Sequence, residues 1–268
     1  MSNNLYIVPY DFTPVADKAL AYALHLGGKV NAEIRVIHLA ASKAKGMPKV
    51  QLLEDVKNRQ NIPHGVELTT KVRVGSIFTD ISKIAKEESA QLIIMGTHGS
   101  RGLQSMFGSH AMKVITSADC PFIIVQKHTK IVDVKSIVVP IDLTKESLQI
   151  VSLAGDLAKM FNAEVHVIAE KQSDQILNTR IQNRIGLVKK QYEETEVKAQ
   201  INMVKNRGSY GKKVTEYFKK NNNDIVAIAY HSESLFPQFD SFAQNLITNK
   251  AGLPVMVINS KLASALYF

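Results

Sequence analysis

The sequence has little cysteine and no long hydrophobic run, and each absence excludes a class of protein. Cys120 is the only cysteine among 268 residues, which rules out an internal disulfide framework and a cysteine-based zinc site. Its position before Pro121 and an apolar run favours a buried structural thiol over a nucleophile. No apolar run approaches the roughly 20 residues that a membrane-spanning helix requires. The first residues lack the basic and apolar segments of a secretory signal, so we expect a cytoplasmic protein that does not associate with membranes.

Negative charge is in the minority, since 33 lysines and arginines face 24 aspartates and glutamates, for a formal net charge of +9. The basic residues are scattered among acidic ones, and no aromatic-interleaved basic motif accompanies them. We therefore interpret them as a solvated surface and expect no nucleic-acid binding. The same net charge favours anionic small ligands. A content of 45% hydrophobic and 21% charged residues is typical of a soluble globular protein.

Catalytic and metal-binding patterns are also missing from the sequence. The Gly-x-Ser-x-Gly nucleophile elbow does not occur, and Ser105 and Ser109 have no nearby His and Asp in that arrangement. His64, His98 and His231 lack the spacing of metal ligands. We assign no catalytic residue and no metal ligand, and expect Mg²⁺ only as the companion of a bound nucleotide.

An internal repeat determines the organisation of the chain. Residues 8–13, VPYDFT, recur 131 positions later as residues 139–144, VPIDLT. Farther along the offset becomes 133, where the apolar residues 92–95 match residues 225–228. Because surface connections tolerate short insertions, this change of two residues still fits a duplication. The chain is therefore a tandem repeat of one unit.

We predict two domains of the α/β class, at residues 1–130 and 131–268. Short apolar strands alternate with helices, which implies a doubly wound, mostly parallel five-stranded sheet in each domain, with helices on both faces. In such sheets ligands bind at the carboxyl ends of the strands, where the strand order reverses. The strands expected in the first domain lie at residues 5–8, 34–39, 68–74, 92–95 and 122–125, and a helix at residues 78–88.

Further helices are indicated by caps and apolar stripes. Thr13 can cap a helix that has Pro14 at its first position. The long connections at residues 42–63 and 171–198 each contain an amphipathic pattern. We interpret both as helices that pack against their own sheet, and a flap over the ligand edge is the alternative. The apolar stripes consist of Ala16, Ala19, Leu20, Ala23 and Leu24 after Thr13, of Val50, Leu53 and Val56, and of Ile181, Ile185 and Val188.

The glycine-rich stretch from Gly96 to His110, GTHGSRGLQSMFGSH, is the most informative segment. It follows the expected strand at residues 92–95, and Ser109 opens an apolar-periodic segment. A strand, a glycine-rich loop and a helix start together form a cradle for phosphate, because the first N–H groups of the helix are unpaired. The Walker pattern is absent, since no lysine follows Gly108.

These features resemble the universal stress protein family in its tandem two-domain form, over nearly the whole chain. The resemblance rests on Pro9-Tyr10-Asp11 at the end of the first strand, on His38 at the end of the second, and on the run LIIMGTHG. In the nucleotide-binding branch of the family, nine residues separate the second and third glycines of the loop. Here eight residues separate Gly99 from Gly108. The resemblance implies an adenine nucleotide α-hydrolase-like fold.

The resemblance also implies ATP, with or without Mg²⁺, as the ligand of the first domain. Asp11 would contact the nucleoside, and the backbone of Leu39 would border the adenine. Met95 and Gly96 would lie beside the adenine and the ribose. For Asp11, a carboxylate that only ties the strand end to the next helix start is an equal alternative. The phosphates would be held by Gly99, Gly108, Ser109 and His110.

The second domain keeps the aspartate and loses the glycines. Asp142 stands where Asp11 does, so this aspartate alone does not report nucleotide binding. A phenylalanine at the helix start would fill the space that a phosphate needs. We therefore expect nucleotide in the first domain only. The residues that replace Gly96, Gly99, Gly108 and Ser109 are Ala229, Ser232, Ser241 and Phe242.

Three functions compete. The leading one is a stress-response protein that binds ATP or a related adenine nucleotide and acts as a regulator or interaction module for protein partners. The second is a slow ATPase, against which stands the lack of a base near the expected phosphates. The third is a structural interaction protein without nucleotide. The resemblance further implies an intramolecular pseudo-dimer through residues 122–125 and 255–258, and leaves homodimerisation open.

Overall fold

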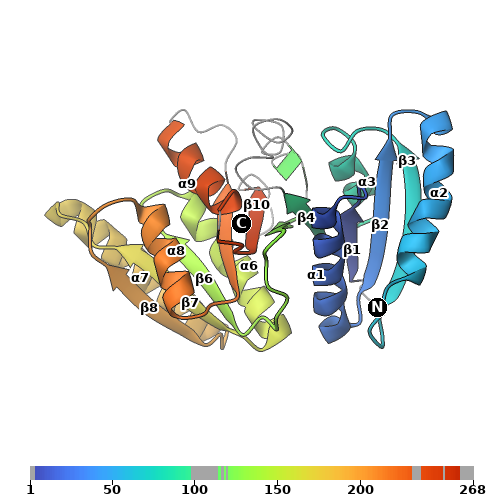
Figure 1. Cartoon of the computed structure of the whole chain (residues 1–268). Helices are drawn as coiled ribbons and strands as arrows, with labels where there is room; N and C mark the ends of the chain where they lie inside the picture. Colours follow the sequence, from blue (N-terminus) through green and yellow to red (C-terminus); the bar gives the residue numbers. More distant parts are fainter. Residues whose placement is uncertain are drawn as a thin grey trace. The chain divides into compact units, whose positions relative to one another are not determined.

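A computed structural model describes most of the chain (Figure 1). The described residues are 4–97, 114–115, 118, 120–230, 237–249 and 251–259, with the side chains of residues 237–241 excepted. Four of the residues expected to bind nucleotide lie outside the described residues, namely Gly99, Gly108, Ser109 and His110.

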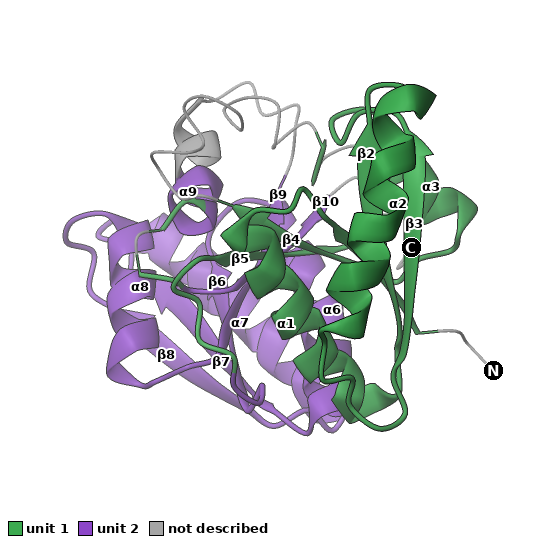
Figure 2. Ribbon diagram, turned by 45° about the vertical axis from the view of Figure 1, so that its right-hand side comes forward, with its two compact units in different colours: residues 1–131, 248–252 green, residues 132–247, 253–268 purple. Residues whose placement is uncertain are grey.

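The chain divides into two compact units (Figure 2). Unit 1 comprises residues 1–131 and 248–252, and unit 2 comprises residues 132–247 and 253–268.

Unit 1 contains a parallel sheet with the strand order β3-β2-β1-β4-β5. The order reverses between β1 and β4. Because crossovers between parallel strands are right-handed, α1 and α2 cover one face of this sheet and α3 the other (Figure 1). The α/β class predicted from the sequence is confirmed. The elements are β1 (Leu5–Pro9), α1 (Pro14–Val30), β2 (Glu33–Ala40), α2 (Lys43–Asn58), β3 (Glu67–Val74), α3 (Ile81–Glu87), β4 (Leu92–Thr97) and β5 (Phe122–Gln126).

Unit 2 repeats this order as β8-β7-β6-β9-β10, again with parallel pairing. Its central strands are buried along most of their length, as expected for a sheet with helices on both faces. The elements are β6 (Ser136–Ile141), α6 (Glu146–Phe161), β7 (Glu164–Glu170), α7 (Gln175–Glu194), β8 (Ala199–Val204), α8 (Tyr210–Lys220), β9 (Ile225–Tyr230), α9 (Pro237–Ile247) and β10 (Val255–Asn259).

The first helix of each unit contacts a threonine at its first turn and ends in the same way as its counterpart. The Thr13 hydroxyl accepts an N–H of the first turn of α1 at 3.4 Å, and Thr144 does the same for α6 at 3.4 Å. Both helices end at an asparagine in the left-handed conformation, Asn31 and Asn162, each with φ 51°. The cap predicted at Thr13, with Pro14 in the first turn, is confirmed. The expected α1 stripe is buried throughout.

The helix expected at residues 78–88 is shorter than the sequence indicated. α3 begins only at Ile81, because the preceding residues form a turn in which the Asp80 carboxylate accepts the Ser76 N–H at 2.8 Å. Because of this turn, the residues just before Ile81 lie at the carboxyl edge of the sheet. In a longer helix they would lie elsewhere.

The two long connections contain the helices α2 and α7, as predicted. α2 packs against β2 and β3, and α7 packs against β7 and β8, so each covers its own sheet. Val50 is the exception in the expected stripes, since its side chain is 53% exposed. The other stripe residues are buried, namely Leu53, Val56, Ile181, Ile185 and Val188.

Three further observations concern the described part of the chain. None of its helices combines the length and the apolar character needed to cross a bilayer. It also contains no group of three or more His, Cys, Asp or Glu residues able to hold a metal ion. Cys120 is buried, as expected for a structural thiol.

Candidate functional site

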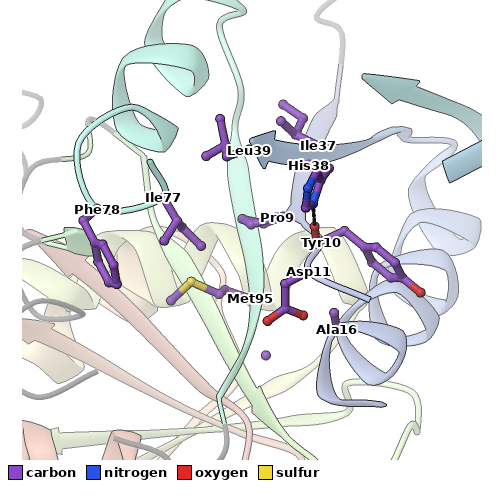
Figure 3. Close-up of a pocket in the computed structure, with 11 residues that line it drawn as sticks. Pro9, Tyr10, Asp11, Ala16, Ile37, His38, Leu39, Ile77, Phe78 and Met95 are labelled. Carbon is purple, nitrogen blue, oxygen red and sulfur yellow. Dashed lines mark hydrogen bonds between the residues drawn. The ribbon is translucent and has the colours of Figure 1, made fainter. Parts of the chain in front are cut away.

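A cavity of about 150 Å³ lies at the carboxyl ends of β1, β2 and β4 in unit 1 (Figure 3). This is the place where the strand order reverses, and parallel sheets commonly bind ligands there. In Figure 3, Asp11 and Ala16 stand on one side of Met95, and Ile77 and Phe78 on the other. The cavity therefore combines one carboxylate with mostly apolar walls.

The sequence-predicted residues that the structure describes lie together. Asp11, Leu39, Met95 and Gly96 all line this cavity, although they come from three different strand ends. The parallel topology explains this, because the carboxyl ends of adjacent strands meet at one edge of the sheet.

Asp11 has a structural task that it shares with its counterpart in unit 2. Its Oδ1 accepts the Thr13 N–H at 3.1 Å and also the Thr13 hydroxyl. Asp142 binds Thr144 in the same way, with an N–H distance of 2.8 Å. The interpretation of this aspartate as a tie between strand end and helix start is thus confirmed in both units. Because both bonds use Oδ1, the exposed Asp11 carboxylate keeps a second oxygen that a ligand can use.

Gly96 is required by packing. A Cβ at this position would lie 2.3 Å from the Val15 carbonyl oxygen and 2.7 Å from its carbon, because the first turn of α1 passes directly over β4. The matching residue of unit 2 is Ala229, so the corresponding helix and strand there accommodate a methyl group. The glycine is therefore explained without a ligand.

The side chain of His38 is held by a backbone carbonyl. Its Nδ1 donates to the Tyr10 carbonyl at 2.8 Å, which places the proton of the neutral ring on Nδ1. The Phe12 ring lies 5.0 Å from the His38 ring, and the Lys49 ammonium lies 4.9 Å above the Phe12 ring. Phe12 reaches this place in the left-handed conformation, with φ 63°. These contacts fit a structural histidine at the rim of the site.

Ile77 and Phe78 were missed by the sequence reasoning. Both line the cavity from the turn between β3 and α3. The signal was present in Gly75, Ser76 and Asp80, a glycine and a small polar residue followed by an aspartate that can accept the serine N–H. The hydrogen bonds from the Ser76 N–H and the Thr79 hydroxyl hold the pKa of Asp80 below its usual value.

Unit 2 places its own aromatic side chains at the matching region. Tyr210 stands where Ile77 does, at the offset of 133, and its hydroxyl lies 2.6 Å from the Ile168 carbonyl and 3.1 Å from the Ile141 carbonyl. Its ring stacks on Phe242, with centroids 5.4 Å apart. Burial holds the pKa of Tyr210 well above its usual value, so the hydroxyl remains a hydrogen-bond donor. Phe242 was expected at a helix start, where it would fill the space of a phosphate, but α9 begins at Pro237, so this placement was wrong. Phe242 lies inside α9, and its ring packs on Tyr210.

The same duplication is visible in comparisons with known proteins. The sequence pattern of the universal stress protein family matches residues 6–126 and again residues 133–259. The universal stress protein MJ0531 of Methanocaldococcus jannaschii is 30% identical over 146 residues, which cover 47% of this chain and 86% of that protein. YxiE of Bacillus subtilis, also a universal stress protein, is 28% identical over 147 residues, which cover 46% of this chain and 99% of that protein.

A solved structure extends the likeness to the whole chain. A universal stress protein from Archaeoglobus fulgidus matches with a TM-score of 0.77 at 14% identity, over 97% of this chain and 100% of that one. At this identity the likeness establishes the fold alone. The two family matches together span most of the sequence, so the chain belongs to the universal stress protein family and carries two of its domains in tandem.

Proposed function

We propose that this protein is a stress-response protein whose first domain, residues 1–130, binds ATP or a related adenine nucleotide in the cytoplasm. Occupancy would then regulate how the chain interacts with protein partners. The observation that carries the proposal is the cavity at the strand-order reversal of unit 1, which gathers Asp11, Leu39, Met95 and Gly96.

The chemistry of this cavity suits a nucleoside. The apolar side chains of Leu39, Ile77 and Met95 offer surface to a flat base. The second oxygen of Asp11 can accept from ribose hydroxyls or from an adenine amino group. The glycine-rich loop starts at Gly96 itself, so the backbone N–H groups of the loop would donate to the phosphates of a nucleotide bound in the cavity. Mg²⁺ would accompany the phosphates.

We propose one nucleotide per chain. In unit 2 the region that corresponds to the cavity holds the Tyr210 ring, which is fixed by the carbonyls of Ile141 and Ile168 and by Phe242. A base entering there would have to displace this ring and leave its hydrogen bonds unmade.

The experiment is calorimetric titration of ATP into the full chain, after extraction and identification of any small molecule that copurifies. We expect saturation at one ATP per chain and no binding to a Gly99→Val, Gly108→Val variant. The matched control is the Ser232→Val, Ser241→Val variant, which changes the corresponding positions of the second domain and should bind like wild type.

Each outcome decides between functions. Absence of ATP binding to the wild type would overturn the proposal in favour of a structural interaction protein. Two sites per chain would contradict the assignment of unit 2. Formation of ADP by the wild type and not by the glycine variant would favour the ATPase.

A further inference from the structure

The turn between β3 and α3 is built around one carboxylate. Asp80 Oδ2 accepts the Ser76 N–H at 2.8 Å and the Thr79 hydroxyl at 2.7 Å, and the Ser76 hydroxyl accepts the Phe78 N–H at 3.2 Å. A Cβ on Gly75, which has φ 155°, would lie 2.8 Å from the same Asp80 oxygen. The turn is therefore closed by short local contacts that fix where Ile77 and Phe78 lie.

This turn places an aromatic side chain at the cavity. Phe78 and its neighbour Ile77 line the cavity opposite Asp11 and Ala16 (Figure 3). Phe78 is half-buried in the described structure. A half-buried aromatic ring at the edge of an apolar cavity offers a face on which a planar base can stack.

Unit 2 shows what the same segment does without the carboxylate. Lys213 replaces Asp80, and it forms an ion pair with Glu170 and donates to the Lys205 carbonyl at 2.9 Å. Helix α8 then begins at Tyr210, which corresponds to Ile77, whereas α3 begins at Ile81. The segment that forms a cavity wall in unit 1 is thus the start of a helix in unit 2, and its first residue fills the matching region.

We propose that Phe78 is a specificity-determining residue for the ligand of the first domain, that it stacks on a planar base, and that Asp80 is the residue that positions it. This proposal rests on the proposed function, because it concerns the same cavity. It assigns recognition of the base to a segment outside the glycine-rich loop.

Two probes separate base recognition from phosphate recognition. ATP carries a base, and inorganic triphosphate does not. Phe78→Leu keeps apolar bulk and removes the aromatic face, so we expect about tenfold weaker binding of ATP and unchanged binding of triphosphate. Asp80→Lys introduces the residue of unit 2, and it should weaken the binding of ATP while leaving the binding of triphosphate unchanged. Asp80→Asn retains an acceptor for the Ser76 N–H and should bind ATP nearly like wild type.

A spectroscopic readout is available because the chain contains no tryptophan. Phe78→Trp introduces a single reporter at the proposed stacking position, and its fluorescence should change on addition of ATP and not of triphosphate. Tyr210→Trp is the matched control at the corresponding region of unit 2, and its fluorescence should not respond. Thermal unfolding of each variant without ligand shows that the chain is folded before titration.

The outcomes distinguish the two proposals. If the wild type binds no ATP, the proposed function fails and the role of Phe78 fails with it. If the wild type binds ATP and Phe78→Leu binds it equally well, only the role of Phe78 is overturned. The role of Phe78 would also be overturned if Phe78→Leu weakened the binding of ATP and of triphosphate equally. A loss of affinity that does not depend on the base indicates general damage to the site.

Discussion

The two units share a strand order, a threonine that accepts an N–H of the first turn of the first helix, and an aspartate at the end of the first strand. They differ in what occupies the edge of the sheet. Unit 1 has a cavity there, with Gly96 and Phe78 at its border. Unit 2 has a stacked pair, Tyr210 on Phe242. The shared features therefore belong to the architecture, and the function has to be read from the differences.

The largest expected effect is the loss of the Tyr210 ring from unit 2. Tyr210→Ala would leave a void and remove the hydrogen bonding of its hydroxyl to the Ile141 and Ile168 carbonyls, so we expect a loss of about 3 kcal/mol in the free energy of unfolding. Denaturant unfolding measures the loss, and hydrogen exchange of peptides from β6 and β7 locates it in unit 2.

Two controls make this comparison sharper. Tyr210→Phe keeps the ring and removes the hydroxyl, and it should cost about 1 kcal/mol. Added 4-methylphenol, which is the side chain of tyrosine, should restore protection in Tyr210→Ala if the void has the shape of the ring. Unchanged stability of Tyr210→Ala would mean that the tyrosine does not support unit 2.

A methyl group at the end of β4 should have the next largest effect. Gly96→Ala would place its Cβ against the Val15 carbonyl, and we expect a loss of about 2 kcal/mol in the stability of the unliganded protein. The reciprocal change Ala229→Gly, at the matching strand of unit 2, should cost less than about 1 kcal/mol. Thermal unfolding without nucleotide measures both. Equal effects would show that α1 and α6 approach their sheets in the same way.

The two aspartates should separate stability from binding. Asp11→Ala and Asp142→Ala each remove a side-chain acceptor from the same turn, so each should cost about 1 kcal/mol of stability. Only Asp11→Ala should weaken the binding of ATP, as measured by calorimetric titration. If Asp142→Ala weakened ATP binding by the same amount, a single site in the first domain would be contradicted.

The sequence predicted the features that depend on local pattern and on duplication. The α/β class, the family and the cap at Thr13 are confirmed because a repeat, an apolar period and a capping residue each follow from neighbouring residues. The cavity position followed from topology, and the domain division at residue 130 stays a prediction. The roles of Asp11 and its companions as ligand contacts also stay predictions.

The rest depended on contacts between distant segments. The predicted start of α3 was wrong because the Asp80 carboxylate holds the preceding residues in a turn, although their apolar period is that of a helix. The role of Gly96 in packing depends on how closely the Val15 backbone approaches it. The sequence of the loop does not indicate this approach. Tyr210 could not be assigned because its partners, the Ile141 and Ile168 carbonyls, are backbone groups that any residue carries.

The smallest expected effect concerns the pH dependence of an ion cluster on β2 and β3. Glu88 lies 2.6 Å from the Lys71 ammonium and also pairs with Arg35. Burial acts to raise the pKa of Glu88, but the hydrogen bonds from Lys71 and Arg35 outweigh it and hold this pKa below its ordinary value of 4.5. The corresponding residues of unit 2 are Asn221, Asn202 and His166, so this ion cluster is particular to unit 1.

A carboxylate with a lowered pKa in the folded state stabilises the fold above its ordinary pKa, and this contribution is lost as the pH falls through the folded pKa. We therefore expect Glu88→Gln to cost about 0.5 kcal/mol at neutral pH, and this difference from wild type to shrink below about pH 4.5. Hydrogen exchange of β2 and β3 peptides over this range measures it, with β7 and β8 peptides as the control. A difference that stays constant with pH, or that appears equally in unit 2, would show that the charge of Glu88 does not stabilise unit 1.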